Sequence, residues 1–283
     1  MIDVGPAGSP NRQSRTTVVT FLGAVVRPLG DWMPIAGAVD LLGQAGLDAP
    51  SVRTAVHRLK GNGWLVSQPR DDVRGYALTE TALETLAAGD EVIWHARTPA
   101  ELAEGWCIVH FGVPESMRPK RQQLRAHLAH LGFGNVGTAL WIAPARMRAA
   151  AQRAVTELEL ESHTAVFVGD YHGTQDLTTL LYDSWDLAGI DQSYRDFVTA
   201  HDRLLAAVED VPPEPARAFP TYLALLDRWR RLPFRDPGLP AEVLAPDWSA
   251  PRAVAVFERL VAGLEGPALD HARAHCAPAR EIA

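Results

Sequence analysis

Lysine and cysteine are scarce in this 283-residue chain. The only lysines are Lys60 and Lys120, so nearly all of the positive charge is carried by arginine. The only cysteines, Cys107 and Cys276, stand far apart and cannot supply the disulfide framework of a small secreted domain. We therefore expect a reducing, cytoplasmic location.

Long apolar runs are missing as well. No stretch of about eighteen consecutive apolar residues occurs, so we expect no membrane span and no membrane partner. Residues 1–15 are rich in Gly, Pro, Ser and Asn and lack the apolar core of a secretion signal. We expect this segment to be a disordered arm.

The motifs of common enzyme classes are also absent. The chain has no Gly-x-Ser-x-Gly nucleophile turn and no phosphate-binding P-loop. Residues 132–137 match the letters of a dinucleotide-binding loop, Gly-x-Gly-x-x-Gly. Such a site needs a strand before it and a helix after it, whereas the pattern here predicts a helix followed by a strand. We interpret the segment as a turn and expect no catalytic residues and no cofactor.

One histidine pair has metal-ligand spacing. His271 and His275 are four residues apart on a predicted helix, beside Cys276 and Asp270, which can bring two imidazoles to one metal ion. Short histidine motifs often match by chance, and no glutamate completes a metalloprotease pattern. We expect no metal site.

The most informative segment that is present begins at Asp48, which can cap a helix whose first turn contains Pro50. An apolar stripe at helical spacing follows: Val52, Ala55, Val56 and Leu59. The opposite face has two guanidiniums, a hydroxyl and an imidazole but no acid: Arg53, Thr54, His57 and Arg58. Such groups donate to phosphates and to the acceptor edges of bases in the major groove.

The flanking residues extend this pattern. A first helix is predicted over residues 17–26 and a second over 35–45, with Ile35, Ala38, Val39 and Leu42 facing inward, and the short connector Gly46-Leu-Asp48 is typical of a helix-turn-helix corner. A strand begins at Trp64, a polar turn at Arg70-Asp-Asp-Val-Arg74-Gly, and a returning strand at Tyr76. Thr79 then caps a helix over residues 80–88. The pattern predicts a winged helix-turn-helix; the alternative is an amphipathic helix beside a hairpin, with its arginines merely solvated.

The net charge of −7 is unevenly distributed. Residues 1–75 contain eight Lys/Arg and six Asp/Glu, and residues 118–153 contain seven Lys/Arg and no acid. The last stretch, residues 154–283, contains eleven Lys/Arg and twenty-one Asp/Glu. Because salt screens charges over about 8 Å in the cell, a remote acidic region does not prevent DNA contact by the first block.

The remaining chain divides into two further regions. Between residues 98 and 175, strands over 106–111, 138–143 and 163–169 alternate with helices over 118–131 and 145–160. From residue 176 the pattern is mostly helical, with helices expected over 190–208, 218–231 and 252–264. We therefore expect an α+β protein with a disordered arm (1–15), a winged helix-turn-helix domain (16–97), a central ferredoxin-like α/β domain (98–175) and a helical C-terminal domain (176–283).

The ordered set of motifs resembles the PaaX-type family of bacterial repressors, named for phenylacetic acid catabolism. In the first third the resemblance is carried by Val52-Arg-Thr-Ala-Val-His-Arg-Leu, Gly63-Trp-Leu and Tyr76-Ala-Leu-Thr. Further along it is carried by Arg121-x-x-Leu-Arg125, Leu131-Gly-Phe-Gly, Leu140-Trp-Ile-Ala-Pro144, Trp185-Asp-Leu-x-x-Ile190 and Tyr194-x-x-Phe197. A late signature is Arg230-Arg-Leu-Pro-Phe-Arg-Asp-Pro-Gly-Leu-Pro240 with Asp247-Trp248. The match extends over roughly residues 16–265.

This resemblance implies a winged helix, a ferredoxin-like middle domain, a helical C-terminal domain and a homodimer. It also implies an anionic effector for some members, an aryl-coenzyme A thioester. The middle region is similar in outline to small ferredoxin-like nucleases, but its strand over residues 106–111 offers no acidic residue for a metal ion. We see no basis there for nuclease chemistry.

The role of the other arginines stays open. The block 118–153 is either two solvated helix faces, a set of additional DNA-backbone contacts or a cradle for an anionic effector. The effector candidates are Arg121, Arg125, Arg230 and Arg231. Aromatic residues could line an apolar acyl site, although core packing is the simpler interpretation for each: Trp141, Trp185, Tyr194 and Trp229.

We expect a DNA-binding transcriptional regulator, a dimeric repressor that binds double-stranded operator DNA and is released by a small anionic effector such as an acyl- or aryl-coenzyme A. The residues expected to contact DNA are Arg53, Thr54, His57, Arg58, Arg70 and Arg74. The alternative is a ligand-processing enzyme or a protein-interaction module with an accessory winged helix.

Overall fold

The computed structural model describes residues 10–93, 98–211 and 213–276. Their contacts form two compact units, each built from separate stretches of the chain. Of the described residues, the first unit combines those in the ranges 10–93, 197–231 and 252–276, and the second combines 98–196 with 232–251. The units are described one at a time. The predicted domain boundaries remain a prediction, because the C-terminal residues contribute to both units.

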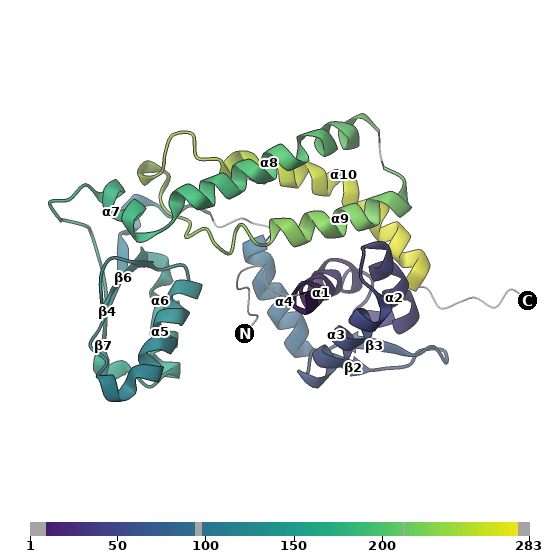
Figure 1. Cartoon of the computed structure of the whole chain (residues 1–283), viewed down its shortest axis with the longest axis horizontal. Helices are drawn as coiled ribbons and strands as arrows, with labels where there is room; N and C mark the ends of the chain where they lie inside the picture. The colour runs from purple at the N-terminus through teal and green to yellow at the C-terminus, as the bar shows by residue number, and fades with distance from the viewer. Residues whose placement is uncertain (1–9, 94–97, 212, 277–283) are drawn as a thin grey trace, which may run out of the picture. The chain divides into compact units, whose positions relative to one another are not determined.

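The N-terminal part of the first unit alternates helices with three short strands. In chain order these are α1 (Pro10–Phe21), a π-helical turn (Leu22–Val26), β1 (Trp32–Pro34), α2 (Ile35–Gln44), α3 (Ala49–Gly61), β2 (Leu65–Ser67), β3 (Gly75–Leu78) and α4 (Glu80–Ile93). The strands form an antiparallel sheet in the order β1-β3-β2. Figure 1 shows α1, α2 and α3 grouped together, with the β2–β3 hairpin extending from them.

Three expectations for this part need correction. Helix α1 begins at Pro10, inside the segment expected to be a disordered arm, because proline at the first helical position loses no hydrogen bond. Strand β1 was missed because three residues ending in proline show no alternation, and only pairing with β3 makes them a strand. Helix α4 continues to Ile93, five residues beyond its expected end.

The core of this part matches the predicted apolar stripes closely. Val52, Ala55, Val56 and Leu59 of α3 are all buried. On α2, Ala38 and Leu42 are buried as expected, but Leu41 is buried where the half-exposed Ile35 and Val39 were expected.

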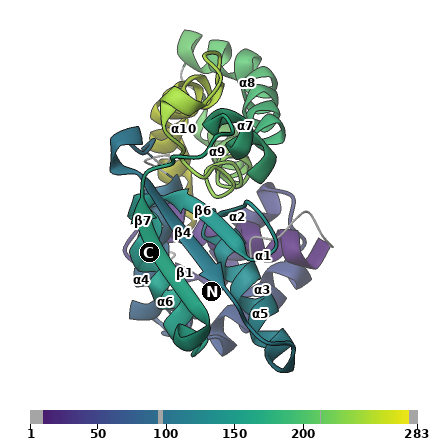
Figure 2. The same cartoon turned by 90° about the vertical axis from the view of Figure 1, so that its left-hand side faces the viewer.

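The second unit contains a four-stranded antiparallel sheet with two helices on one face. Its elements are β4 (Trp106–Phe111), α5 (Arg118–His130), β5 (Gly134–Asn135), β6 (Leu140–Pro144), α6 (Arg148–Glu157) and β7 (Thr164–Gly169), and the strand order is β5-β6-β4-β7. Figures 1 and 2 both show α5 and α6 on the same face of the sheet formed by β4, β6 and β7: to the right of the sheet in Figure 1 and behind it in Figure 2.

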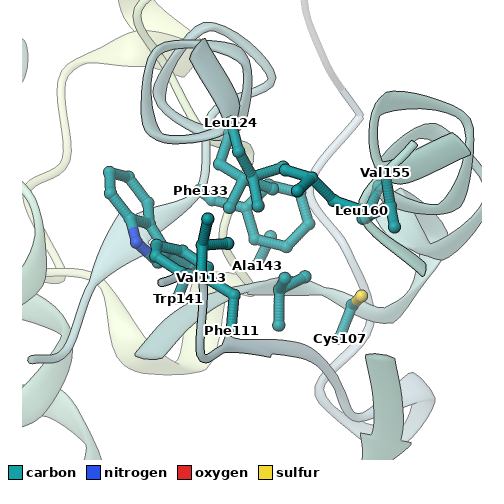
Figure 3. Packing of buried hydrophobic residues seen from close by; sticks show 12 residues of the cluster. Cys107, Phe111, Val113, Leu124, Phe133, Trp141, Ala143, Val155 and Leu160 are labelled. Carbon is teal, nitrogen blue, oxygen red and sulfur yellow. The ribbon is translucent and has the colours of Figure 1, made fainter. Parts of the chain in front are cut away.

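Alternation along the strands explains this layer. Cys107, Val109 and Phe111 of β4 point to the helices and are almost fully buried, and Val155 of α6 and Leu124 of α5 pack in the same cluster. Figure 3 shows Cys107, Phe111, Leu124 and Val155 of this cluster together with Phe133, Trp141 and Leu160. The expected strands and helices are therefore present, with shifted ends: α6, for example, starts at Arg148 after a 3₁₀ turn at Ala145–Met147.

The glycine-rich segment at residues 132–137 is not a nucleotide loop. It follows α5 and contains the short edge strand β5, which pairs with β6. The Trp185 indole lies over Gly134, where an added Cβ would come within 2.6 Å of the ring, and its Nε1 donates to the Gly132 carbonyl at 3.1 Å. The glycine is needed because an aromatic ring occupies the position of a side chain.

Four helices make up most of the C-terminal part: α7 (Leu177–Ser184), α8 (Leu187–Asp210), α9 (Pro215–Trp229) and α10 (Ala250–Cys276). Helix α7 was not predicted. In the first unit, Trp229 of α9 stacks on Phe257 of α10 with ring centroids 4.3 Å apart and donates its indole N–H to the Ile93 carbonyl at 2.7 Å. Tyr194 of the second unit is buried and donates to Asp236 at 3.0 Å. The four aromatic residues considered for an acyl site thus take part in packing.

Candidate nucleic-acid interface

The corner between α2 and α3 is held by two local devices. Gly46 has a positive φ of 89°, and Leu47 N–H returns to the Leu42 carbonyl at 3.0 Å, which ends α2. The predicted cap is confirmed: Asp48 accepts hydrogen bonds from the Ser51 backbone N–H and from its hydroxyl, both at 2.8 Å. These bonds hold the Asp48 pKa below its ordinary value. The first turn of α3 is therefore fixed by its own sequence.

The face of α3 opposite its apolar stripe is open to solvent. Arg53, Thr54, His57 and Arg58 are all exposed, as predicted. No carboxylate lies on this face of the helix, so the formal charge that its own residues contribute there is positive. Burial of the stripe and exposure of these four side chains follow from one helical period.

The β2–β3 hairpin ends in a tight turn. Arg70 and Val73 exchange backbone hydrogen bonds of 3.1 and 2.8 Å, and the two residues between them have positive φ, 46° at Asp71 and 60° at Asp72. Two consecutive left-handed residues define a turn of type I′, which aspartate tolerates better than most residues. The Asp71 and Asp72 carboxylates therefore lie at the tip between Arg70 and Arg74.

The two hairpin arginines differ in their surroundings. Arg70 is exposed and its guanidinium lies 5.0 Å from the centre of the Trp32 ring, which is a cation–π contact. Arg74 is also exposed. Gly75, at the start of β3, has no room for a side chain, because a Cβ there would lie 2.7 Å from the Met33 carbonyl oxygen and against the Trp32 ring. Arg70 is thus oriented by the edge strand that the sequence did not reveal.

Three residues at the start of the basic block at residues 118–153 pair with two acids that flank the block. Arg121 pairs with Glu115 at 2.6 Å and also donates to the Val113 carbonyl, while Arg118 lies 3.8 Å from the same glutamate. Lys120 pairs with Glu159 at 2.8 Å, and the pKa of that carboxyl is lowered by the ammonium group. The first three basic residues of the block therefore have acid partners that the local sequence does not indicate.

Two further members of the block differ in environment. Arg125 is half-buried on α5. Arg146 donates to the Thr98 carbonyl and, at 3.0 Å, to the Gly238 carbonyl, so it ties together loops of its own unit. Of the two effector candidates on α5, Arg121 is paired with Glu115, whereas Arg125 has no such ion pair among the described residues.

The two effector candidates after α9, Arg230 and Arg231, also differ in burial and in hydrogen bonding. Arg230 is buried and donates to the Thr20 hydroxyl at 2.9 Å, while Asp227 accepts from the Thr17 and Thr20 hydroxyls. This cluster attaches α9 to α1. Arg231 is exposed and lines a pocket of about 580 Å³ together with Arg228.

The C-terminal histidines contact α2. His271 Nε2 lies 2.7 Å from the Gln44 amide oxygen, and His275 Nε2 lies 3.3 Å from an Asp40 carboxylate oxygen. Within the described residues, no three His, Cys, Asp or Glu side chains are grouped closely enough to hold a metal ion. In those same ranges, no helix has both the length and the apolar content to cross a membrane.

Comparison with known proteins covers nearly the whole described chain. Residues 13–82 match the PaaX-like protein family, residues 99–181 the PaaX protein central Cas2-like domain, and residues 185–274 the PaaX-like protein C-terminal domain.

Two relatives illustrate the range of similarity. The transcriptional repressor PaaX of Escherichia coli K12 is 25% identical over 214 residues, which are 74% of this chain and 67% of the repressor. An uncharacterised protein of Mycobacterium tuberculosis has a similar fold, with a TM-score of 0.61 at 20% identity, over 92% of this chain and 98% of that one. With three PaaX domains matched in order along its length, the chain belongs to the PaaX family.

Proposed function

We propose that this protein is a DNA-binding transcriptional repressor that acts as a homodimer and is controlled by a small anionic effector. The observation that carries the proposal is the solvent-exposed cationic face of α3, fixed at its start by the Asp48 cap and accompanied by an arginine-bearing hairpin. Operator contact by such a face requires no catalytic group. The repressor relative supports a regulator over a ligand-processing enzyme or a protein-interaction module.

The arrangement of the first unit supports a winged helix-turn-helix. The order α1-β1-α2-α3-β2-β3 and the sheet order β1-β3-β2 place the hairpin directly after the second helix of the pair. In this proposal α3 enters the major groove, where Arg53 and Arg58 contact base edges or phosphates, and Thr54 and His57 add further hydrogen-bonding groups. Arg70 and Arg74 on the wing contact the backbone, which positions the protein without reading sequence.

The second unit supports a ferredoxin-like central domain. Its elements run β-α-β-β-α-β, and the sheet order β5-β6-β4-β7 brings the first and third strands of the domain together at the centre. The three-domain division of the chain remains part of the proposal. In this proposal the domain has no nuclease role, because β4 contributes no acidic side chain to its sheet.

A homodimer would explain an apolar edge of this sheet. Strand β7 pairs on one side only, and its Phe167 and Val168 are 59% and 49% exposed. An unpaired edge with large apolar side chains favours association with another chain. Light scattering measures the mass directly: Phe167→Glu should shift a dimer toward monomer, and a monomeric wild type at micromolar concentration would refute the dimer.

The effector in this proposal is an acyl- or aryl-coenzyme A. Arginine forks suit phosphate oxygens, and the described residues include exposed arginines such as Arg231. Release from DNA requires that the effector bind the DNA-incompetent arrangement more tightly than the competent one. Tight binding alone would not release the operator.

Fluorescence anisotropy tests the function. The full chain is titrated into labelled duplexes from the DNA upstream of its own gene and into a shuffled duplex of equal length, at two salt concentrations. A repressor should bind at least one upstream fragment far more tightly than the shuffled duplex. Equal affinity for all duplexes would contradict operator recognition, and no binding at low salt would contradict DNA binding altogether.

A further inference from the structure

The pocket in the first unit lies between the helix-turn-helix corner and α9. Its volume is about 580 Å³, within the range of small-molecule sites. One wall is the corner itself, Ala45 to Asp48 with Ser51 of α3. The other is formed by Leu223 and Arg228 of α9 and by Arg231, just after the end of that helix. All of these residues belong to the same compact unit.

The free donors of this pocket are cationic. Both of its acids are engaged internally: Asp48 caps α3 through Ser51, and Asp227 accepts from the Thr17 and Thr20 hydroxyls. Arg228, in the last turn of α9, and Arg231, two residues after the end of that helix, have no hydrogen-bond or ion-pair partner among the described residues, and both line the pocket. The apolar floor is formed by Leu47, Pro220 and Leu223.

We propose that this pocket binds a small organic anion whose carboxylate or phosphate pairs with Arg228 and Arg231 and whose apolar part lies on Leu47, Pro220 and Leu223. This assignment rests on the proposed function and locates its effector. A compact anion fits this pocket better than a DNA backbone does. Asp48 and Asp227 offset the charge of the two arginines, so the pocket exerts little net attraction on a phosphate that stays at a distance.

The position of the pocket links occupancy to DNA contact. The Asp48 carboxylate that lines it is also the N-cap of α3, five residues before Arg53. A ligand that bridges Arg228 or Arg231 and the corner changes the spacing between α9 and the first turn of α3. The corner contains Gly46, whose backbone is in the left-handed region, so a small backbone rotation there changes the direction of α3.

The test compares three proteins: the wild type, Arg228→Ala/Arg231→Ala, and Arg217→Ala as a matched control. Arg217 is an exposed arginine of the same helix that does not line the pocket. Each is titrated with an aryl-coenzyme A thioester, free coenzyme A, phenylacetate and inorganic phosphate, and thermal shift and operator release are followed. Coenzyme A and phosphate report a phosphate-led ligand, and phenylacetate reports a carboxylate-led one.

We expect at least one probe to stabilise the wild type and the Arg217→Ala control equally, and to release both from operator DNA. The double variant should bind operator normally without the probe, but its affinity for the probe should fall about tenfold or more, as charge-assisted bonds are lost. Ala224→Phe, which fills the pocket and leaves both arginines in place, should also lower the affinity for the probe.

Other outcomes overturn the assignment in distinguishable ways. If the double variant responds to the probe like the wild type, the effector binds elsewhere, and the proposal of an anionic effector is retained. If no probe stabilises the wild type, the effector and its site both fall, while operator binding stands. If the double variant loses operator affinity without any probe and Ala224→Phe responds normally, the two arginines contact DNA instead.

Discussion

Helices α3 and α5 are both basic, but their charges are used differently. On α3, Arg53 and His57 project into solvent from a face without acids. On α5, Arg121 and Lys120 are paired with Glu115 and Glu159, which lie just outside the acid-free block. A count of charges along the sequence ranks α5 as the more cationic helix. The structure shows that α3 has the more accessible charge, because pairing depends on the neighbours that folding supplies.

The largest expected effect is on α3. Arg53→Ala and Arg58→Ala should each cost on the order of 1–3 kcal/mol of operator binding, roughly 5- to 150-fold in affinity, if each contacts a base edge. The fold should persist, since neither residue belongs to the buried stripe. Anisotropy with the wild-type operator and with single-base variants measures both the loss and the relaxed specificity.

The matched control for this prediction is Arg118→Ala/Lys120→Ala on α5. It should change operator affinity by less than about twofold, because both residues already pair with carboxylates. If α3 variants bind like the wild type while the α5 variant is impaired, the roles of the two helices are reversed.

The difference between α3 and α5 also shows which structural features can be predicted from the sequence. The α3 stripe, the Asp48 cap and the corner glycine were predicted because they depend on residues within one or two helical turns. The Glu159–Lys120 pair spans 39 positions, and nothing local indicates it. Strand β1 was missed for the same reason, because its partner β3 lies about forty residues away.

The candidate site was predicted only in part. Arg53, Thr54, His57 and Arg58 were found because one helical period separates them from the core. Arg228 could not be distinguished from Arg230 in the sequence, although Arg228 faces a pocket and Arg230 is buried against α1. Helix periodicity gives the face of α9, but only the packing of α9 against the corner creates a cavity.

A smaller effect is expected on the wing. Arg70→Ala/Arg74→Ala should weaken operator and shuffled duplexes about equally, because phosphate contacts carry no sequence information. The slope of log affinity against log salt should decrease by about 2, one for each lost contact. Because Arg70 also stacks on Trp32, a thermal melt must accompany the titration. An unchanged slope in a folded variant would show that the wing does not touch DNA.

The smallest effect is expected where a charge is already paired. Lys120→Met removes the ammonium group that lowers the Glu159 pKa, and should leave both operator affinity and the melting temperature at neutral pH nearly unchanged, since exposed pairs contribute little. The sign of the pH dependence is fixed by the lowered pKa. The stabilisation is present above the ordinary pKa of a glutamate and is lost as the pH falls through the folded-state value. The small difference in melting temperature between wild type and Lys120→Met should therefore disappear in acid, and it should shrink in high salt even at neutral pH. A melting difference that persists in acid would show that Lys120 stabilises the protein by packing its alkyl chain, and a loss of operator affinity would show that α5 binds DNA after all.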